Sequence, residues 1–365
     1  MNVVPASCPG SVLVMLLVTT LLLSHLLLCD TCSNFIMEDT FGLSVRTEDT
    51  SPPKSTEDYD ISLVTAPAQH LDLNLTSIPF VAFVAMKLGP HATPLNASQG
   101  IKAGINLAGL SCDEQSLSET SFPSFNPTKI NIDAALLCKY CLQRFQTVSA
   151  LHAHLLLDTV NFIQPKYDPN DFGHQHWILR DSTGETLVIE FIEGVMQLYR
   201  DNNDNGITGY GVVTNSPPFP WQIKNMQFID WKQRKYNNAY SVPGDWYPDS
   251  RFQRLSMVKR AMKNVAPTTL QEAVAQAVHV ANTVSVPPGT QMGKDMSDAA
   301  DDHRTEFVVI YDHKNSVVYW RSVWNQNFAR IQLQDLDLDV GDAQKVLLVK
   351  SAAIPWFVDA IDLMQ

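Results

Sequence analysis

The chain has 365 residues, a formal net charge of −12 and an isoelectric point near 5.2. Hydrophobic residues make up 45% of it and charged residues 18%, which is typical of a globular protein with a sizeable core. The negative charge argues against a nucleic-acid-binding protein, which needs a basic face to neutralise phosphates. After residue 31 the sequence has no apolar run of about 20 residues, which argues against a multi-span membrane protein.

An apolar segment lies close to the amino terminus. Residues 12–28 are almost all Val, Leu and Met, and the first Lys or Arg in the chain is Arg46. This pattern predicts a secretory signal peptide over residues 1–31, with an uncleaved membrane anchor as the alternative. Cleavage after Thr31 would leave Cys32 as the first residue of a secreted chain that is not stably inserted in a membrane.

Sequons and cysteines are further features of the sequence that relate to secretion. Asn74 and Asn96 each begin an acceptor sequon, which predicts N-glycosylation of a secreted chain. Four of the six cysteines follow the leader, too few for a disulfide scaffold in a chain of this length. Cys138 and Cys141 have CxxC spacing inside a predicted helix, without a second CxxC, and are interpreted as core residues.

Two histidine pairs have the spacing of metal ligands. They are His152 with His154 and His174 with His176. The first pair does not share a helix face, and no carboxylate or third histidine completes a set for the second. We therefore interpret all four as ordinary histidines and expect neither a metal nor a cofactor.

Apolar patterns and turn residues predict the following elements in chain order. Strands are expected first, at residues 32–35, 43–46, 61–65, 80–86 and 101–110. Two helices follow, then four strands, two helices and three strands, at 132–145, 147–157, 175–181, 186–192, 195–199, 211–214, 250–263, 268–282, 307–311, 317–321 and 329–333. This order, with no long linker, predicts one α+β domain of layered sheets over residues 32–365.

Six short motifs occur in a fixed order along this domain. They are Cys32-Ser-Asn-Phe, Arg46-Thr-Glu-Asp49, Gly104-Ile-Asn-Leu-Ala-Gly-Leu-Ser111, Val213-Thr-Asn-Ser-Pro217, the run from Pro243 to Arg254, and Phe307-Val-Val-Ile-Tyr-Asp312. In this order they resemble the choloylglycine hydrolase family, which includes bile salt hydrolases and penicillin V acylases. The resemblance implies an N-terminal nucleophile hydrolase with a four-layer αββα sandwich. Such an enzyme cleaves linear amide C–N bonds of small N-acyl compounds, often as a homo-oligomer (a tetramer or dimer).

The resemblance also implies roles for individual residues. Carried over one by one, they are Cys32 as the nucleophile, Arg46 and Asp49 as the Arg-x-x-Asp pair, Asn215 as the Asn of the TNSP motif, Arg251 as the first Arg of the SRFxR motif, and Ser116 at the remaining oxyanion position. The segment around Ser116 departs from the family pattern, which bears on substrate preference.

These residue types suit amide hydrolysis. A thiol attacks an amide only as a thiolate, so it needs a base or a lowered pKa. A free α-amino group has an ordinary pKa near 8 and can take the thiol proton directly or through water. Asp49 could orient that amine, Arg46 and Arg251 could stabilise the thiolate, and Asn215 could donate to the oxyanion.

Two other interpretations stay open. A secreted binding protein on the same fold would have lost catalysis, and an uncleaved leader would support it. A ceramidase- or acylethanolamine-type amidase would be activated by cleavage before an internal cysteine and would need a long propeptide. Only 31 residues, mostly apolar, precede Cys32.

Overall fold

The computed structural model describes nine segments of the chain, residues 32–37, 40–50, 59–72, 75–87, 100–165, 174–201, 210–236, 241–290 and 303–358. The predicted leader, Asn74 and Asn96 lie outside these residues. Signal cleavage and glycosylation therefore stay predictions.

A six-stranded antiparallel sheet contains the first described strand and three strands from the C-terminal part of the chain. Its strand order is β14 (Val212–Thr214), β1 (Ser33–Ile36), β2 (Leu43–Thr50), β15 (Arg304–Asp312), β16 (Val317–Ser322) and β17 (Ala329–Gln332). The predicted first strand thus lies between β14 and β2, with Ser33 opposite Thr214 on one side and Thr47 on the other.

A second antiparallel sheet has eight strands. Its order is β13 (Val195–Asp201), β12 (Thr186–Ile192), β11 (Gln175–Arg180), β8 (Ser111–Ser116), β7 (Ile101–Asn106), β6 (Phe80–Lys87), β3 (Tyr59–Ala66) and β18 (Val346–Leu348). Two further pairs are a parallel one of β9 (Ile130–Asp133) with β10 (Val160–Ile163), and an antiparallel one of β4 (His70–Asp72) with β5 (Leu75–Thr76).

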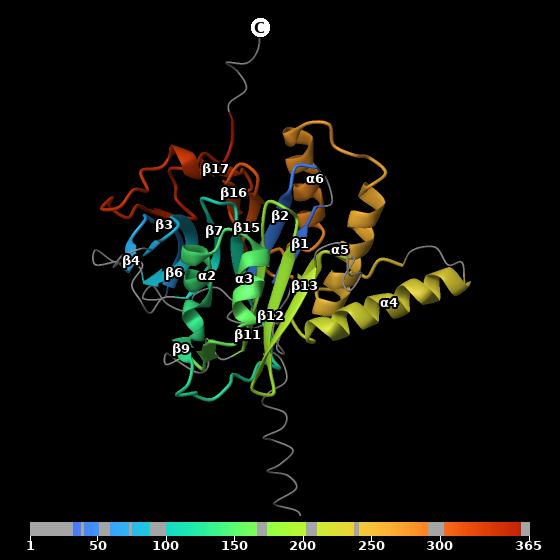
Figure 1. The fold of residues 1–365 in the computed structure, drawn as a ribbon. Coiled ribbons are helices and arrows are strands. Elements are labelled where there is room, and N and C mark those ends of the chain that lie inside the picture. Colours follow the sequence, from blue (N-terminus) through green and yellow to red (C-terminus); the bar gives the residue numbers. More distant parts are fainter. Residues whose placement is uncertain are drawn as a thin grey trace, which may run out of the picture.

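Helices cover the outer faces of both large sheets (Figure 1). The eight-stranded sheet carries α2 (Leu137–Arg144) and α3 (Val148–Leu155), and the six-stranded sheet carries α5 (Pro248–Met262) and α6 (Leu270–Asn282). A third apolar cluster joins the inner faces, where Phe83 of one sheet stacks on Phe307 of the other at 5.1 Å. The predicted four-layer αββα sandwich is confirmed.

Local sequence explains several helix boundaries. The Thr147 side chain accepts a hydrogen bond from Ala150 N and begins α3, as expected of an N-cap. Thr269 and Glu272 form a reciprocal capping box at the start of α6. The helix predicted over 132–145 begins later, because β9 continues to Asp133 and a 3-10 turn at Ala134–Leu136 precedes α2.

The segment predicted as one strand at 101–110 consists of β7 and the turn that joins it to β8. Asn106 Oδ1 accepts from the backbone of Ala108 and Leu110, at 3.1 and 3.0 Å, which closes a turn. Gly109 has a φ of +86°, and a Cβ there would lie 2.1 Å from the carbonyl oxygen of His313. The turn therefore needs glycine at this position.

Two further features differ from the sequence analysis. An 18-residue helix, α4 (Phe219–Tyr236), follows the TNSP motif where no element was predicted. Cys138 is not only a core residue, since it forms a disulfide with Cys112 between α2 and β8, with a Cα–Cα distance of 5.4 Å. Cys141 is buried with a free thiol, as the core interpretation requires.

Candidate active site

The candidate site lies where β1, β2 and β14 run side by side. Cys32 directly precedes β1, Arg46 and Asp49 lie on β2, and Asn215 directly follows β14. Because β1 pairs with both neighbours, residues far apart in sequence meet at one end of β1. Five of the six residues singled out in the sequence come from these strands or from the end of β8.

Arg251 connects the nucleophile candidate to Asn215. It lies in the first turn of α5, fully buried. Its Nη1 donates to the carbonyl oxygen of Cys32 and to Ser33 Oγ, the latter at 2.7 Å, while its Nη2 donates to Asn215 Oδ1 at 2.8 Å. The planar guanidinium therefore holds the backbone of Cys32 and the side chain of Asn215 in a fixed relative position.

The Cys32 thiol is almost inaccessible, at 5% exposure. Its Sγ lies 3.8 Å from Glu48 Oε2 and 3.8 Å from the carbonyl oxygen of Asp49. Burial raises the pKa of this thiol far above its ordinary value, and the charge of Glu48 raises it further, against the opposing effect of Arg46. A peptide-linked Cys32 in these surroundings is a neutral thiol at physiological pH.

Arg46 lies between the sheets, 1% exposed. Its Nη1 forms an ion pair with Glu48, and its Nη2 donates to the carbonyl oxygen of Glu114 on β8. Glu114 in turn pairs with Lys102 at 2.8 Å. The arginine that the sequence places near the thiol is thus held by an acidic neighbour and by the second sheet.

Asp49 is also buried. Thr305 Oγ1 on β15 donates to its Oδ1, and Thr47 Oγ1 donates to its Oδ2 at 3.3 Å. Burial raises the pKa of Asp49 to about 7, although Arg251 and the Thr305 hydrogen bond lower it. A carboxyl group with this pKa can exchange protons near neutrality.

Asn215 Nδ2 donates to the carbonyl oxygen of Ser116 at 2.9 Å. An amide nitrogen carries two hydrogens, so one remains for an oxyanion. The structure thus places Ser116 beside Asn215 through its backbone, and a role for its hydroxyl group stays a prediction.

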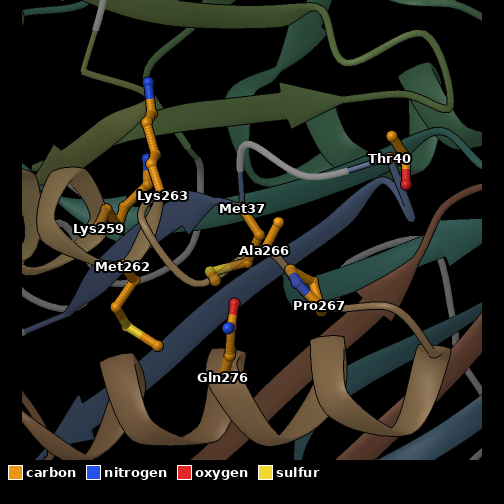
Figure 2. Close-up of a pocket in the computed structure, with 8 residues that line it drawn as sticks. All are labelled: Met37, Thr40, Lys259, Met262, Lys263, Ala266, Pro267 and Gln276. Atoms are coloured by element: carbon orange, nitrogen blue, oxygen red, sulfur yellow. The ribbon is translucent and has the colours of Figure 1, made fainter.

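A separate pocket of about 470 Å³ opens at the far end of β1. Figure 2 shows its lining side chains, which come from the chain after β1, from α5 and α6 and from their connection: Met37, Thr40, Lys259, Met262, Lys263, Ala266, Pro267 and Gln276. None of the six site residues lines it. At about 3.3 Å per residue, Met37 lies some 16 Å along the strand from Cys32.

The described part of the chain contains no group of three or more His, Cys, Asp or Glu side chains that could hold a metal ion. None of its helices is long and apolar enough to cross a membrane. Of the histidine pairs, His176 is buried with its Nδ1 3.0 Å from Glu190 Oε1, and His154 lies 2.8 Å from Tyr140 OH.

Comparison with known proteins decides the family. Residues 67–346 match the family model of linear amide C–N hydrolases of the choloylglycine hydrolase family. The chain belongs to the choloylglycine hydrolase family. The match begins after β3, so it does not include Cys32, Arg46 or Asp49, whose catalytic roles stay predictions.

Two curated relatives have related names. Penicillin V acylase of Pectobacterium atrosepticum is 26% identical over 250 residues, or 64% of this chain and 62% of that protein. Bile salt hydrolase/transferase of Clostridium perfringens is 23% identical over 197 residues, or 49% of this chain and 56% of that protein. The chain therefore aligns with less than two thirds of each relative's length.

Solved structures agree with the fold. A mutant of conjugated bile acid hydrolase from Clostridium perfringens superposes with a TM-score of 0.67 at 18% identity, covering 87% of this chain and 96% of that one. Penicillin V acylase from Agrobacterium tumefaciens gives 0.66 at 21% identity, covering 87% and 91%.

Sequence reasoning missed three residues of the site. Glu48 lies inside a quoted motif, but its contact with the thiol depends on how β2 faces β1. Thr305 binds Asp49 from 256 residues away, and Ser33 accepts from Arg251 across 218. No sequence signal marks contacts at such separations.

Proposed function

We propose that this chain is a secreted cysteine amidohydrolase of the choloylglycine hydrolase type, with Cys32 as the N-terminal nucleophile. One observation carries the proposal: Arg251 binds the Cys32 carbonyl and Asn215 at once, beside the Arg46–Glu48 pair and Asp49. This arrangement supports the proposal, because one buried cation binds both the backbone of the cysteine and an amide side chain that can donate to an oxyanion.

Cleavage before Cys32 supplies the missing base. The freed α-amino group takes the thiol proton, and the thiolate attacks the carbonyl carbon of the substrate amide. Asn215 Nδ2 donates to the oxyanion that forms. The α-ammonium group then protonates the leaving amine, the C–N bond breaks, and water hydrolyses the remaining thioester.

The substrate class is an N-acyl amide of the bile-salt, penicillin V or another type. Secretion is supported by the apolar leader and by the Cys112–Cys138 disulfide, since disulfides persist mainly in oxidising compartments. Oligomerisation as a dimer or tetramer stays a prediction from the family resemblance.

The test combines intact mass with a panel of N-acyl amides. We expect secreted protein that begins at Cys32 and hydrolyses at least one member, and we expect Cys32→Ala to abolish that hydrolysis. Cys141→Ala is the matched control, because Cys141 is the other buried free thiol among the residues that the structure describes. Full activity of Cys32→Ala, or activity in a chain still blocked before residue 32, would overturn the proposal. A chain that keeps its leader and hydrolyses nothing would favour the binding-protein alternative.

A further inference from the structure

Helix α4 exposes a row of large aromatic side chains. It extends from the body of the protein beyond α5, as Figure 1 shows. Its inner face buries Phe219, Ile223 and Met226 in the core. On its outer face, Trp221, Phe228 and Trp231 are 62%, 58% and 47% exposed. Exposed aromatic groups gathered on one surface commonly mark an interaction site.

Lysines accompany these rings. Lys224 Nζ lies 5.2 Å from the centre of the Trp221 ring, and Lys235 Nζ lies 5.6 Å from that of Trp231. Phe228 stacks on Trp231 with ring centres 5.8 Å apart. The five residues are spaced by three, four, three and four, so they form one stripe along the helix. We refer to Trp221, Lys224, Phe228, Trp231 and Lys235 as the α4 stripe.

The charge of α4 is opposite to that of the chain. The helix contains three lysines and one arginine but a single acid, Asp230, whereas the whole chain has a net charge of −12. Asp230 is bound toward the body of the protein, by Arg260 at 3.0 Å and by Tyr210 OH at 2.8 Å. The lysines of the α4 stripe therefore dominate the charge on its outer face.

We propose that the α4 stripe docks on the surface of an anionic lipid bilayer. Trp and Phe side chains prefer the boundary between headgroups and acyl chains, and Lys side chains pair with lipid phosphates. A helix with this pattern lies in the plane of the surface and does not span it. Charge complementarity disfavours a second copy bound through the same stripe, because two-fold pairing would bring two cationic faces together.

The docking helix is directly connected to the candidate site. Gln222 Nε2, in the first turn of α4, donates to the backbone carbonyl oxygens of Thr214, Asn215 and Pro217 at 2.9, 2.6 and 2.8 Å. Docking would thus hold the Asn215 side of the site near the lipid surface. This step rests on the proposed function, and it implies a substrate with a lipid-like acyl chain that resides in the bilayer.

Vesicle binding tests the docking without requiring activity. The secreted protein, beginning at Cys32, is sedimented with vesicles of phosphatidylcholine alone or with about one third phosphatidylglycerol. We expect binding to the anionic vesicles that weakens with salt. The triple variant Trp221→Ser, Phe228→Ser, Trp231→Ser should lose binding about tenfold or more. Trp356→Ser is the matched control, because Trp356 is 72% exposed outside α4.

Three further readouts test whether the aromatic rings meet the lipid, whether the triple variant is folded, and whether the partner is a second copy of this chain. Brominated lipid should quench tryptophan fluorescence of the parent protein but much less that of the triple variant, and thermal unfolding of both should agree. Absence of binding by the parent protein, or equal binding by the triple variant, overturns the proposal. Light scattering compares the molar mass of the triple variant with that of the parent protein. If the variant has the lower molar mass and the parent does not bind vesicles, the α4 stripe joins copies of this chain. That result would also overturn the proposal. None of these readouts needs hydrolysis. A protein that binds vesicles but hydrolyses no amide would therefore refute the proposed function and leave the docking proposal supported.

Discussion

Replacing Glu48 by Gln is expected to make the Cys32 thiol more acidic. Glu48 Oε2 lies 3.8 Å from Cys32 Sγ, and its charge opposes that of the thiolate. At an effective dielectric constant of about 20, two unit charges at this distance repel by about 4 kcal/mol, or about three pK units. Glu48→Gln removes this repulsion and leaves the positive charge of Arg46 beside the sulfur. We expect the pKa of the thiol to fall by about one to three units, the range allowing for relaxation of the site.

The assay is the rate of Cys32 alkylation by iodoacetamide between about pH 7 and 10, where the rate follows the thiolate fraction and so rises as the pKa falls. Peptide mass counts the reaction of Cys141 separately. Glu185→Gln is the matched control, because Glu185 also pairs with an arginine, Arg200 at 2.7 Å, but on the other sheet. An unchanged or lower alkylation rate for Glu48→Gln would falsify the argument that this carboxylate raises the pKa of the Cys32 thiol. An equal rise in the control would mean that the effect is one of overall charge.

Three further predictions follow from the site and the disulfide. Asn215→Ala should lower kcat by about 10² to 10³ with little change in unfolding temperature, since one oxyanion donor is lost; a loss of stability alone would assign Asn215 a purely structural role. Burial raises the pKa of Asp49 from 3.8 to about 7. While residue 32 is still peptide-linked, the folded state therefore keeps a proton that the unfolded state releases, and stability falls as the pH rises through this window. In urea titrations Asp49→Asn should gain up to about 4 kcal/mol relative to the parent between these pH values, and a parallel pH dependence of the two proteins would contradict this. The pair Cys112→Ser, Cys138→Ser opens a disulfide with a sequence separation of 26, and it should cost about 3.5 kcal/mol of unfolding free energy by the chain-entropy relation. If chemical unfolding midpoints do not change, the disulfide is not formed in the purified protein.

The candidate catalytic residues could be recognised from the sequence in outline because they keep a fixed order and local spacing. Arg46 and Asp49 are three residues apart on one strand, and Asn215 follows a short apolar strand. Strand periodicity and cap residues also predicted most elements, since those signals act over a few residues. The layered α+β architecture followed from the order of those elements.

Other contacts in and around the candidate site depend on the tertiary structure alone. Glu48 was unremarkable until the pairing of β1 with β2 brought its carboxylate within 3.8 Å of the thiol. Thr305 reached Asp49, and Cys138 reached Cys112, only because separate elements pack together. Helix α4 escaped prediction because its buried face is narrow and its exposed face carries aromatic residues. The physical reason is the same in each case: burial, charge and pairing at these positions depend on neighbours that are distant in the chain and become neighbours only on folding.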